Sequence, residues 1–141
     1  MKTHLNLATT DLRKSVSFYS TLLNTRPAIV FADYALFVTN EPALELALDV
    51  RESVNPESDA HYGIFVETVL GVEATIARLN SAGLADSIEC EDDCCYARQT
   101  KMWATDPEGR RWEVYAVHED THERDNEDAQ CCVSEAGALL N

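Results

Sequence analysis

The chain has 141 residues, 45% of them hydrophobic, and a formal net charge of −14 at pH 7. This length allows one domain with a sizeable core and is too short for two ordinary domains. The negative charge disfavours nucleic acid and anionic membrane surfaces as partners, and no apolar run approaches the roughly 18 residues that span a bilayer. Because the N-terminal MKTHLNLATTDL also lacks a signal-peptide core, we expect a soluble, cytoplasmic protein.

The first 50 residues predict a strand, a helix and three further strands. Alternation in THLNLAT predicts a strand over residues 3–9, and apolar residues at helical spacing predict a helix over residues 10–23 that Thr10 or Asp11 caps. Short apolar runs predict strands at residues 28–32, 34–38 and 44–50. The apolar face expected of the helix comprises Leu12, Val16, Tyr19, Leu22 and Leu23.

After the polar linker RESVNPESD, the same order of elements recurs. We expect a strand at residues 61–67, a helix from residue 69 that stops at Gly83, and strands at residues 87–91, 101–106 and 111–117, with DPEG forming the last turn. The fold class is therefore α+β, with two βαβββ modules, about residues 2–50 and 60–118, that form a curved, cup-like mixed sheet with the helices outside. Residues 119–141 carry seven acids and one arginine without apolar periodicity, which predicts an acidic, flexible tail after a domain over residues 1–118.

Three polar side chains stand on strand positions that should face away from the helices. They are His4, His61 and Glu113. Two imidazoles and one carboxylate on converging strands form a triad that suits Fe(II), although other divalent ions would also fit. Taken singly, a histidine on a strand is more often an ordinary surface or core side chain. Glu45 takes the place in the first module that Glu113 takes in the second, and we interpret it as a supporting or solvated carboxylate rather than a fourth ligand.

Four of the five cysteines form two adjacent pairs, Cys94 with Cys95 and Cys131 with Cys132. An odd number of cysteines without a secretory signal argues against a disulfide scaffold. Adjacent cysteines close only a small, strained disulfide ring, so their thiols remain available to a third party. The plainer interpretation of Cys94 and Cys95 is a pair of small buried hydrophobic residues.

Several stretches carry a family resemblance over about residues 2–118. The paired βαβββ modules, with metal residues on the first strand of each and the last strand of the second, resemble the vicinal oxygen chelate superfamily of glyoxalases, bleomycin-resistance proteins and dioxygenases. More specifically, ArsI-type organoarsenical carbon–arsenic lyases and the related cadmium-induced CadI proteins are resembled by THLNLATTDLRKSVSFYSTLLNTRPA, YALFVTNEPALELALD, HYGIFVE and above all CCYARQTKMWATDPEGRRWEVYAV. The fold alone says little about function, since this superfamily hosts many chemistries, whereas the cysteine pair followed by K-x-W-x-T-D-P-E-G is more specific.

The resemblance implies a function and a set of site residues. His4, His61 and Glu113 match the Fe(II) ligands, and Cys94 and Cys95 match the thiols that capture trivalent arsenic. The chemistry agrees, because As(III) is thiophilic and two thiolates on one short loop chelate it at a low entropic cost. The implied activity is Fe(II)- and O2-dependent cleavage of the carbon–arsenic bond of methylarsenite or aromatic arsenicals to give arsenite, a detoxification.

Other residues are candidates for accessory roles. Lys101 is a candidate catalytic residue that orients substrate or oxygen, Trp103 would wall the pocket, and Tyr96 adjoins the thiols; an exposed lysine and a core tryptophan are the plainer interpretations. Cys131 and Cys132 would pass the arsenical to the site or accept the arsenite, unless they are only a metal-scavenging tail.

Two other classes of function stay open. An extradiol dioxygenase or glyoxalase-type metalloenzyme would need the metal triad without the cysteines. A non-enzymatic protein would use the thiols to bind cadmium or arsenite. The sequence leaves open whether the chain is a monomer or a homodimer.

Overall fold

The computed structural model describes residues 1–94 and 97–120, with only the backbone for residues 90–94, 97, 98 and 118–120. The chain divides into two compact units. The first comprises Met1–His61 and Thr105–Arg111, and the second comprises Tyr62–Ala104 and the residues from Trp112 onward. The proposed tail, including Cys131 and Cys132, lies outside the described residues from position 121.

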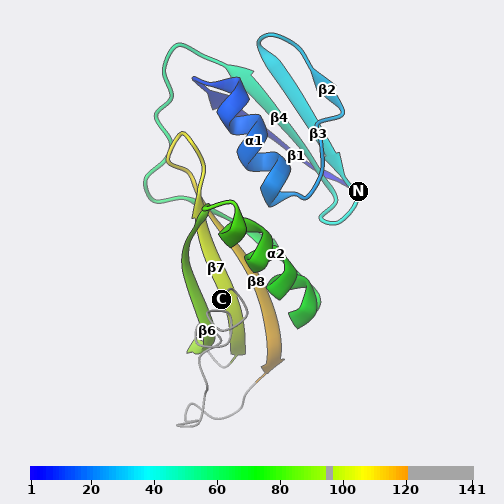
Figure 1. Cartoon of the computed structure of the whole chain (residues 1–141), viewed down its shortest axis with the longest axis vertical. Coiled ribbons are helices and arrows are strands. Elements are labelled where there is room, and N and C mark those ends of the chain that lie inside the picture. Colours follow the sequence, from blue (N-terminus) through cyan, green and yellow to red (C-terminus); the bar gives the residue numbers. More distant parts are fainter. Residues whose placement is uncertain (95–96, 121–141) are drawn as a thin grey trace. The chain divides into compact units, whose positions relative to one another are not determined.

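The first module forms a four-stranded sheet in the order β1-β4-β3-β2. Its elements are β1 (Thr3–Thr9), α1 (Leu12–Leu22), β2 (Ile29–Val30), β3 (Tyr34–Thr39) and β4 (Leu44–Val50). The two strands β1 and β4 pair in parallel, and the β3 pairings with β2 and β4 are antiparallel. Helix α1 packs against β3 and β4 (Figure 1).

The second module repeats this arrangement in a second sheet, in the order β5-β8-β7-β6. Its elements are β5 (His61–Phe65), α2 (Val69–Ser81), β6 (Ala85–Cys94), β7 (Ala97–Thr105) and β8 (Arg111–Asp120). Strands β6 and β7 form an antiparallel hairpin whose register shifts between Glu89 and Asp92. Each module is thus a βαβββ unit with a mixed sheet, which confirms the predicted fold class.

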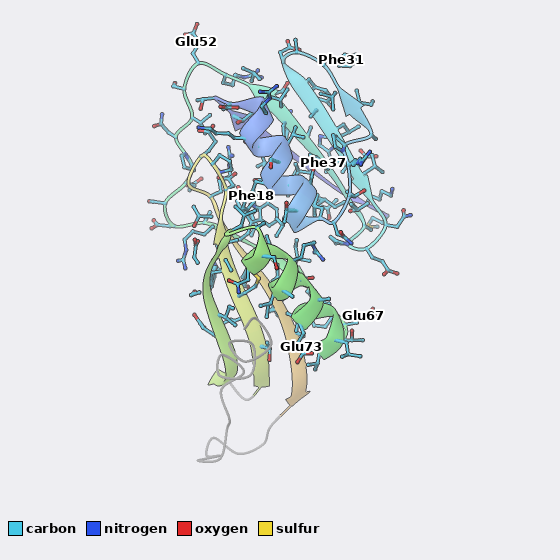
Figure 2. The ribbon with its side chains drawn as sticks, in the orientation of Figure 1. Phe18, Phe31, Phe37, Glu52, Glu67 and Glu73 are labelled. Carbon is cyan, nitrogen blue, oxygen red and sulfur yellow. The ribbon has the colours of Figure 1, made fainter. Side chains whose placement is uncertain are left out.

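The core of the first module lies between α1 and its sheet. Phe18, Tyr19 and Phe37 are buried there, whereas Phe31 is exposed beyond the end of β2 (Figure 2). The predicted helix face was partly wrong, because Ser15 is buried while Val16 is only half-buried. This buried position tolerates a polar residue because the Ser15 hydroxyl lies 2.7 Å from the buried Thr9 hydroxyl, so that each hydroxyl has a hydrogen-bond partner.

The helices begin and end where their capping residues predict. Asp11 accepts a hydrogen bond from the Lys14 backbone N–H at the start of α1, as expected of an N-cap. At the end of α2, Gly83 has a φ of 71°, and the Leu84 N–H donates to the Leu79 carbonyl. A glycine in the left-handed conformation, followed by a residue whose N–H bonds back to a carbonyl of the last helical turn, is the usual C-terminal cap of a helix. It confirms the helix end predicted at Gly83.

Strand lengths depart from the apolar runs that predicted them. Strand β2 spans two residues, although the flanking Ala28 and Phe31 N–H groups also bond to β3. Strands β6, β7 and β8 are longer than expected, and β8 continues to Asp120. The reason is that backbone hydrogen bonding between strands continues through polar residues, whereas a prediction from apolar runs assigns such residues to loops. Among the described residues, no helix is both long and apolar enough to cross a membrane.

Candidate active site

His4 lies on the sheet face of the first module opposite the core. Its strand neighbours Leu7 and Thr9 are buried, while His4 is exposed. Across the parallel ladder its register partner is Glu45, and Nδ1 of His4 lies 3.4 Å from Oε2 of Glu45. With Nδ1 turned to this carboxylate, Nε2 is the ring nitrogen that a metal would use.

A second polar pair continues this face two residues further along. Asn6 donates a hydrogen bond of 2.8 Å from Nδ2 to Asp49 Oδ2, and Arg51 Nη2 lies 3.8 Å from the same carboxylate oxygen. Sequence reasoning did not single out these residues. The signal was present, because His4 and Asn6 alternate with leucines on β1, and Glu45 and Asp49 are the only polar residues of β4 and lie four positions apart.

His61 and Glu113 come from the adjacent strands β5 and β8 of the second module. Tyr62 stacks on the buried Trp112, with ring centroids 4.9 Å apart and planes at 24°. Because strand side chains alternate between faces, this stack turns His61 and Glu113 to the opposite face of the sheet. Glu113 is half-buried there, between the buried Trp112 and Val114.

Lys101 and Trp103 occupy the same face of the second sheet as Glu113. Met102 and Ala104 are buried on the core side, so the residues that alternate with them point away from the core. Lys101 Nζ lies 3.1 Å from Oε2 of Glu89, its register partner on β6. Sequence reasoning missed Glu89, because the pairing that brings it to Lys101 involves a hairpin with an irregular register.

The predicted pair of thiols begins at Cys94, whose backbone the structure describes. Cys94 is the last residue of β6 and pairs with Ala97, the first residue of β7. Cys95 and Tyr96, which connect the two strands, lie outside the described residues, as does the side chain of Cys94. The arsenic-binding role of the thiols therefore stays a prediction.

A buried polar network in the first unit was not predicted from the DPEG turn. Asp106, whose side chain is fully buried, accepts hydrogen bonds from the Glu108 and Arg110 N–H groups. It also accepts from Arg110 Nη1 at 3.1 Å and from the Tyr19 hydroxyl at 2.6 Å. Arg110 in turn donates to the Ala8 carbonyl. The buried carboxylate and guanidinium thus satisfy each other.

Glu108 joins the same turn to the residues that precede α1. Its Oε1 accepts hydrogen bonds from the Thr10 N–H, the Thr10 hydroxyl and the Thr9 hydroxyl. Desolvation by itself raises the pKa of this carboxyl. The hydrogen bonds from Thr10 and Thr9 and the charge of Arg110 outweigh it, so the pKa of Glu108 is held below its ordinary value.

The metal triad is a separate question from these local contacts. Among the residues that the structure describes, no three or more His, Cys, Asp or Glu side chains are grouped to hold a metal ion. His4 belongs to the first unit, whereas Glu113 belongs to the second. The triad of His4, His61 and Glu113 therefore stays a prediction, carried by a donor set of two imidazoles and one carboxylate that suits Fe(II).

A family model described as the Glyoxalase/Bleomycin resistance protein/Dioxygenase superfamily matches residues 3–114. The chain belongs to this superfamily. The match covers both βαβββ modules up to the middle of β8, so the superfamily fold includes all the strands that carry His4, His61, Lys101 and Glu113.

Curated relatives in this superfamily cover most of the chain. A "Trivalent organoarsenical cleaving enzyme" of Bacillus sp. (strain MD1) is 38% identical over 133 residues, which cover 94% of this chain and 83% of the relative. The protein of the same name from Thermomonospora curvata is 39% identical over 132 residues, covering 93% and 87%. "Cadmium-induced protein CadI" of Mycobacterium tuberculosis (strain ATCC 25618 / H37Rv) is 38% identical over 143 residues, covering 93% and 92%.

Solved structures share the fold at lower identity. A glyoxalase/bleomycin resistance protein/dioxygenase from Alicyclobacillus acidocaldarius superposes with a TM-score of 0.70 at 16% identity, covering 85% of this chain and 93% of that one. The fosfomycin resistance protein FosX from Listeria monocytogenes superposes with a TM-score of 0.64 at 16% identity, covering 81% and 90%. At this identity the likeness concerns the fold alone.

Proposed function

We propose that this protein cleaves the carbon–arsenic bond of trivalent organoarsenicals in an Fe(II)- and O2-dependent reaction. The observation that carries the proposal is its relation, at 38% and 39% identity over more than nine-tenths of the chain, to two proteins named trivalent organoarsenical cleaving enzyme. The adjacent cysteines Cys94 and Cys95 support it because trivalent arsenic is thiophilic.

The thiols would bind the substrate before any bond to carbon breaks. In methylarsenite, CH3As(OH)2, each hydroxyl on arsenic is replaced by one cysteine sulfur, and the two thiol protons leave with the hydroxyls as water. The chelate fixes the orientation of the carbon–arsenic bond, because both sulfurs belong to one short stretch of backbone. His4, His61 and Glu113 would hold Fe(II), which supplies open coordination positions for O2.

The overall reaction balances without a further oxidant or reductant. One methylarsenite and one O2 together contain the same atoms as the two products, one arsenous acid and one formaldehyde. Arsenic stays trivalent, and the methyl carbon is oxidised. Lys101 offers an ammonium group on the Glu113 face of the sheet that would stabilise negative charge developing on oxygen.

The proposal is tested by loading the protein anaerobically with Fe(II), adding methylarsenite, admitting air and separating the arsenic species. We expect arsenite with matching consumption of O2. Cys94→Ser/Cys95→Ser should abolish turnover while Fe(II) still binds. Cys90→Ser, which removes a thiol from the same strand, is the matched control and should stay active.

Two results would contradict the proposal. Arsenite formation without oxygen would remove the dioxygenase chemistry. Full turnover of another substrate, such as a catechol or a hemithioacetal, by the double cysteine variant would favour an ordinary extradiol dioxygenase or glyoxalase-type enzyme.

The relation to CadI supports a second candidate function, a non-enzymatic protein that binds cadmium or arsenite through its thiols. Stoichiometric binding of Cd²⁺ or arsenite that depends on Cys94 and Cys95, with no oxygen-dependent turnover of any organoarsenical, would favour this candidate over the enzyme.

A further inference from the structure

Gly63 lies in the middle of β5, on the sheet face that also carries Glu113. The strand runs His61-Tyr62-Gly63-Ile64-Phe65, and Tyr62 packs on the core side against Trp112. His61, Gly63 and Phe65 therefore line the opposite face, where Glu113 lies on the adjacent strand β8.

The space above Gly63 is filled by side chains from β8. A Cβ atom at this position would lie 3.2 Å from Glu113 Oε1, 3.4 Å from Glu113 Cγ and 3.3 Å from Tyr115 Cε1. These separations are tighter than ordinary contacts between carbon and its neighbours. The carboxylate of Glu113 thus lies over the backbone of β5, where any residue other than glycine would place a β-carbon.

Tyr115 limits the ways in which Glu113 can yield. Its ring packs against Phe65, with centroids 5.6 Å apart, and its edge touches the space above Gly63 beside the carboxylate. The Glu113 side chain is also half-buried. A side chain at position 63 would therefore displace the carboxylate or disturb the aromatic pair, since both occupy the same small volume.

We propose that Gly63 is a positioning residue that fixes the place of the Glu113 carboxylate on the adjacent strand β8. His61 lies two residues before Gly63, about 7 Å along the same face of the same strand. The inference rests on the proposed function, because it assumes that Glu113 and His61 bind the metal.

The proposal predicts a graded loss of metal affinity with the size of the side chain at position 63. Gly63→Val adds three carbons where the carboxylate lies, and we expect the dissociation constant for Fe(II) to rise about 10- to 100-fold, the usual effect of disturbing a group that orients a ligand. Gly63→Ala requires a shift of only a few tenths of an ångström and should cause a smaller rise. Anaerobic competition with a chromophoric chelator measures both constants without turnover.

A double-mutant cycle separates this role from a general loss of structure. If Gly63 acts through Glu113, then Gly63→Val should lower metal affinity much less in a Glu113→Gln background than in the wild-type chain. Equal losses in the two backgrounds, or an unchanged dissociation constant in both Gly63→Ala and Gly63→Val, would overturn the inference. If Gly63→Val fails to fold, the same cycle is run with Gly63→Ala.

The failure of this inference is distinguishable from failure of the metal assignment. Unchanged Fe(II) affinity in Glu113→Gln itself would refute the assignment and the inference together. A large loss in Glu113→Gln with none in the Gly63 variants would refute only the role of Gly63. Melting temperatures of each variant without metal show whether a loss of affinity merely follows a loss of stability.

Discussion

The Tyr19 hydroxyl donates a 2.6 Å hydrogen bond to Oδ2 of Asp106, a residue 87 positions later in the sequence. Tyr19 is fully buried in α1, and Asp106 is fully buried in the turn between β7 and β8. The bond thus connects the helix of the first module to a turn that follows most of the second module in the sequence.

Tyr19→Phe should destabilise the fold by about 1–3 kcal/mol, because it removes one donor from a buried carboxylate. Asp106→Ala should cost more, about 3–5 kcal/mol, since it leaves the buried Arg110 guanidinium without its counter-charge. Urea unfolding followed by circular dichroism measures both. Tyr34→Phe, which removes a hydroxyl from a half-buried tyrosine of the same module, is the control and should change stability little. Equal effects of the two tyrosine variants would show that the bond to Asp106 is unimportant.

Glu108→Gln should make the stability less dependent on pH under acidic conditions. The pKa of Glu108 is lowered in the folded state, so its carboxylate contributes stability above its ordinary pKa, near 4.3, and this contribution is lost as pH falls through the lower folded-state pKa. The wild-type chain should therefore exceed the variant in stability at pH 7 and approach it as the pH falls below the lowered pKa of Glu108. Unfolding midpoints across this range provide the measurement. Glu52→Gln, in the exposed linker, controls for loss of a negative charge. A difference that stays constant with pH would refute the role of this carboxylate.

Lys101→Met should lower turnover of methylarsenite, because it removes the ammonium group. Glu89→Gln should lower turnover less, because Glu89 Oε2, 3.1 Å from Lys101 Nζ, only orients that ammonium. The exchanged variant Glu89→Lys/Lys101→Glu discriminates between two roles. It keeps the ion pair and moves the ammonium to β6. If the position of the ammonium matters, the exchanged variant should keep its stability while its turnover of methylarsenite stays low. Full recovery of turnover in the exchanged variant would show that the ion pair is purely structural.

Glu45→Ala should change the state of the His4 ring in the metal-free protein. Glu45 Oε2 lies 3.4 Å from Nδ1, which favours the tautomer with the proton on Nδ1 and the lone pair on Nε2. Nitrogen chemical shifts of the imidazole, recorded in alkaline buffer, report the tautomer directly. In the variant we expect the shift pattern to move toward the tautomer protonated at Nε2. Asp49→Ala, on the same face of the same strand, should leave His4 unaltered, and identical spectra for all three proteins would refute the role of Glu45.

The order of the elements could be predicted from the sequence because each element carries its own local signal. Strand β1 alternates polar and apolar residues over positions 4–7, Asp11 caps α1, and Gly83 ends α2. The inward place of Ser15 could not be predicted, since its partner Thr9 is a buried strand residue that local periodicity does not connect to it. Local patterns also do not show that polar residues extend β6 and β7, because backbone pairing is indifferent to hydrophobicity.

Only the residue types of the candidate site could be proposed from the sequence. Alternation along the strands indicates the sheet faces on which His4, His61 and Glu113 lie, and their role as metal ligands stays a prediction. The residues that contact His4 and Lys101 could not be predicted, because they depend on strand register. The register places Glu45 beside His4 and Glu89 beside Lys101. The importance of Gly63 has no signal of its own in the sequence, because it follows from the side chains that lie over it.

The turn Thr105–Arg111 belongs to the first unit, although 43 residues of the second unit, Tyr62–Ala104, precede it in the chain. The ribosome therefore synthesises every strand of the first sheet long before it supplies Asp106 and Glu108. Until then the phenol of Tyr19 and the hydroxyls of Thr9 and Thr10 lack the carboxylates that they bind in the finished protein. The sheet of the first module is therefore contiguous in sequence, whereas the compact unit that contains it is not. In a nascent chain that stops after β4, the Tyr19 hydroxyl of α1 has not yet met its acceptor, Asp106.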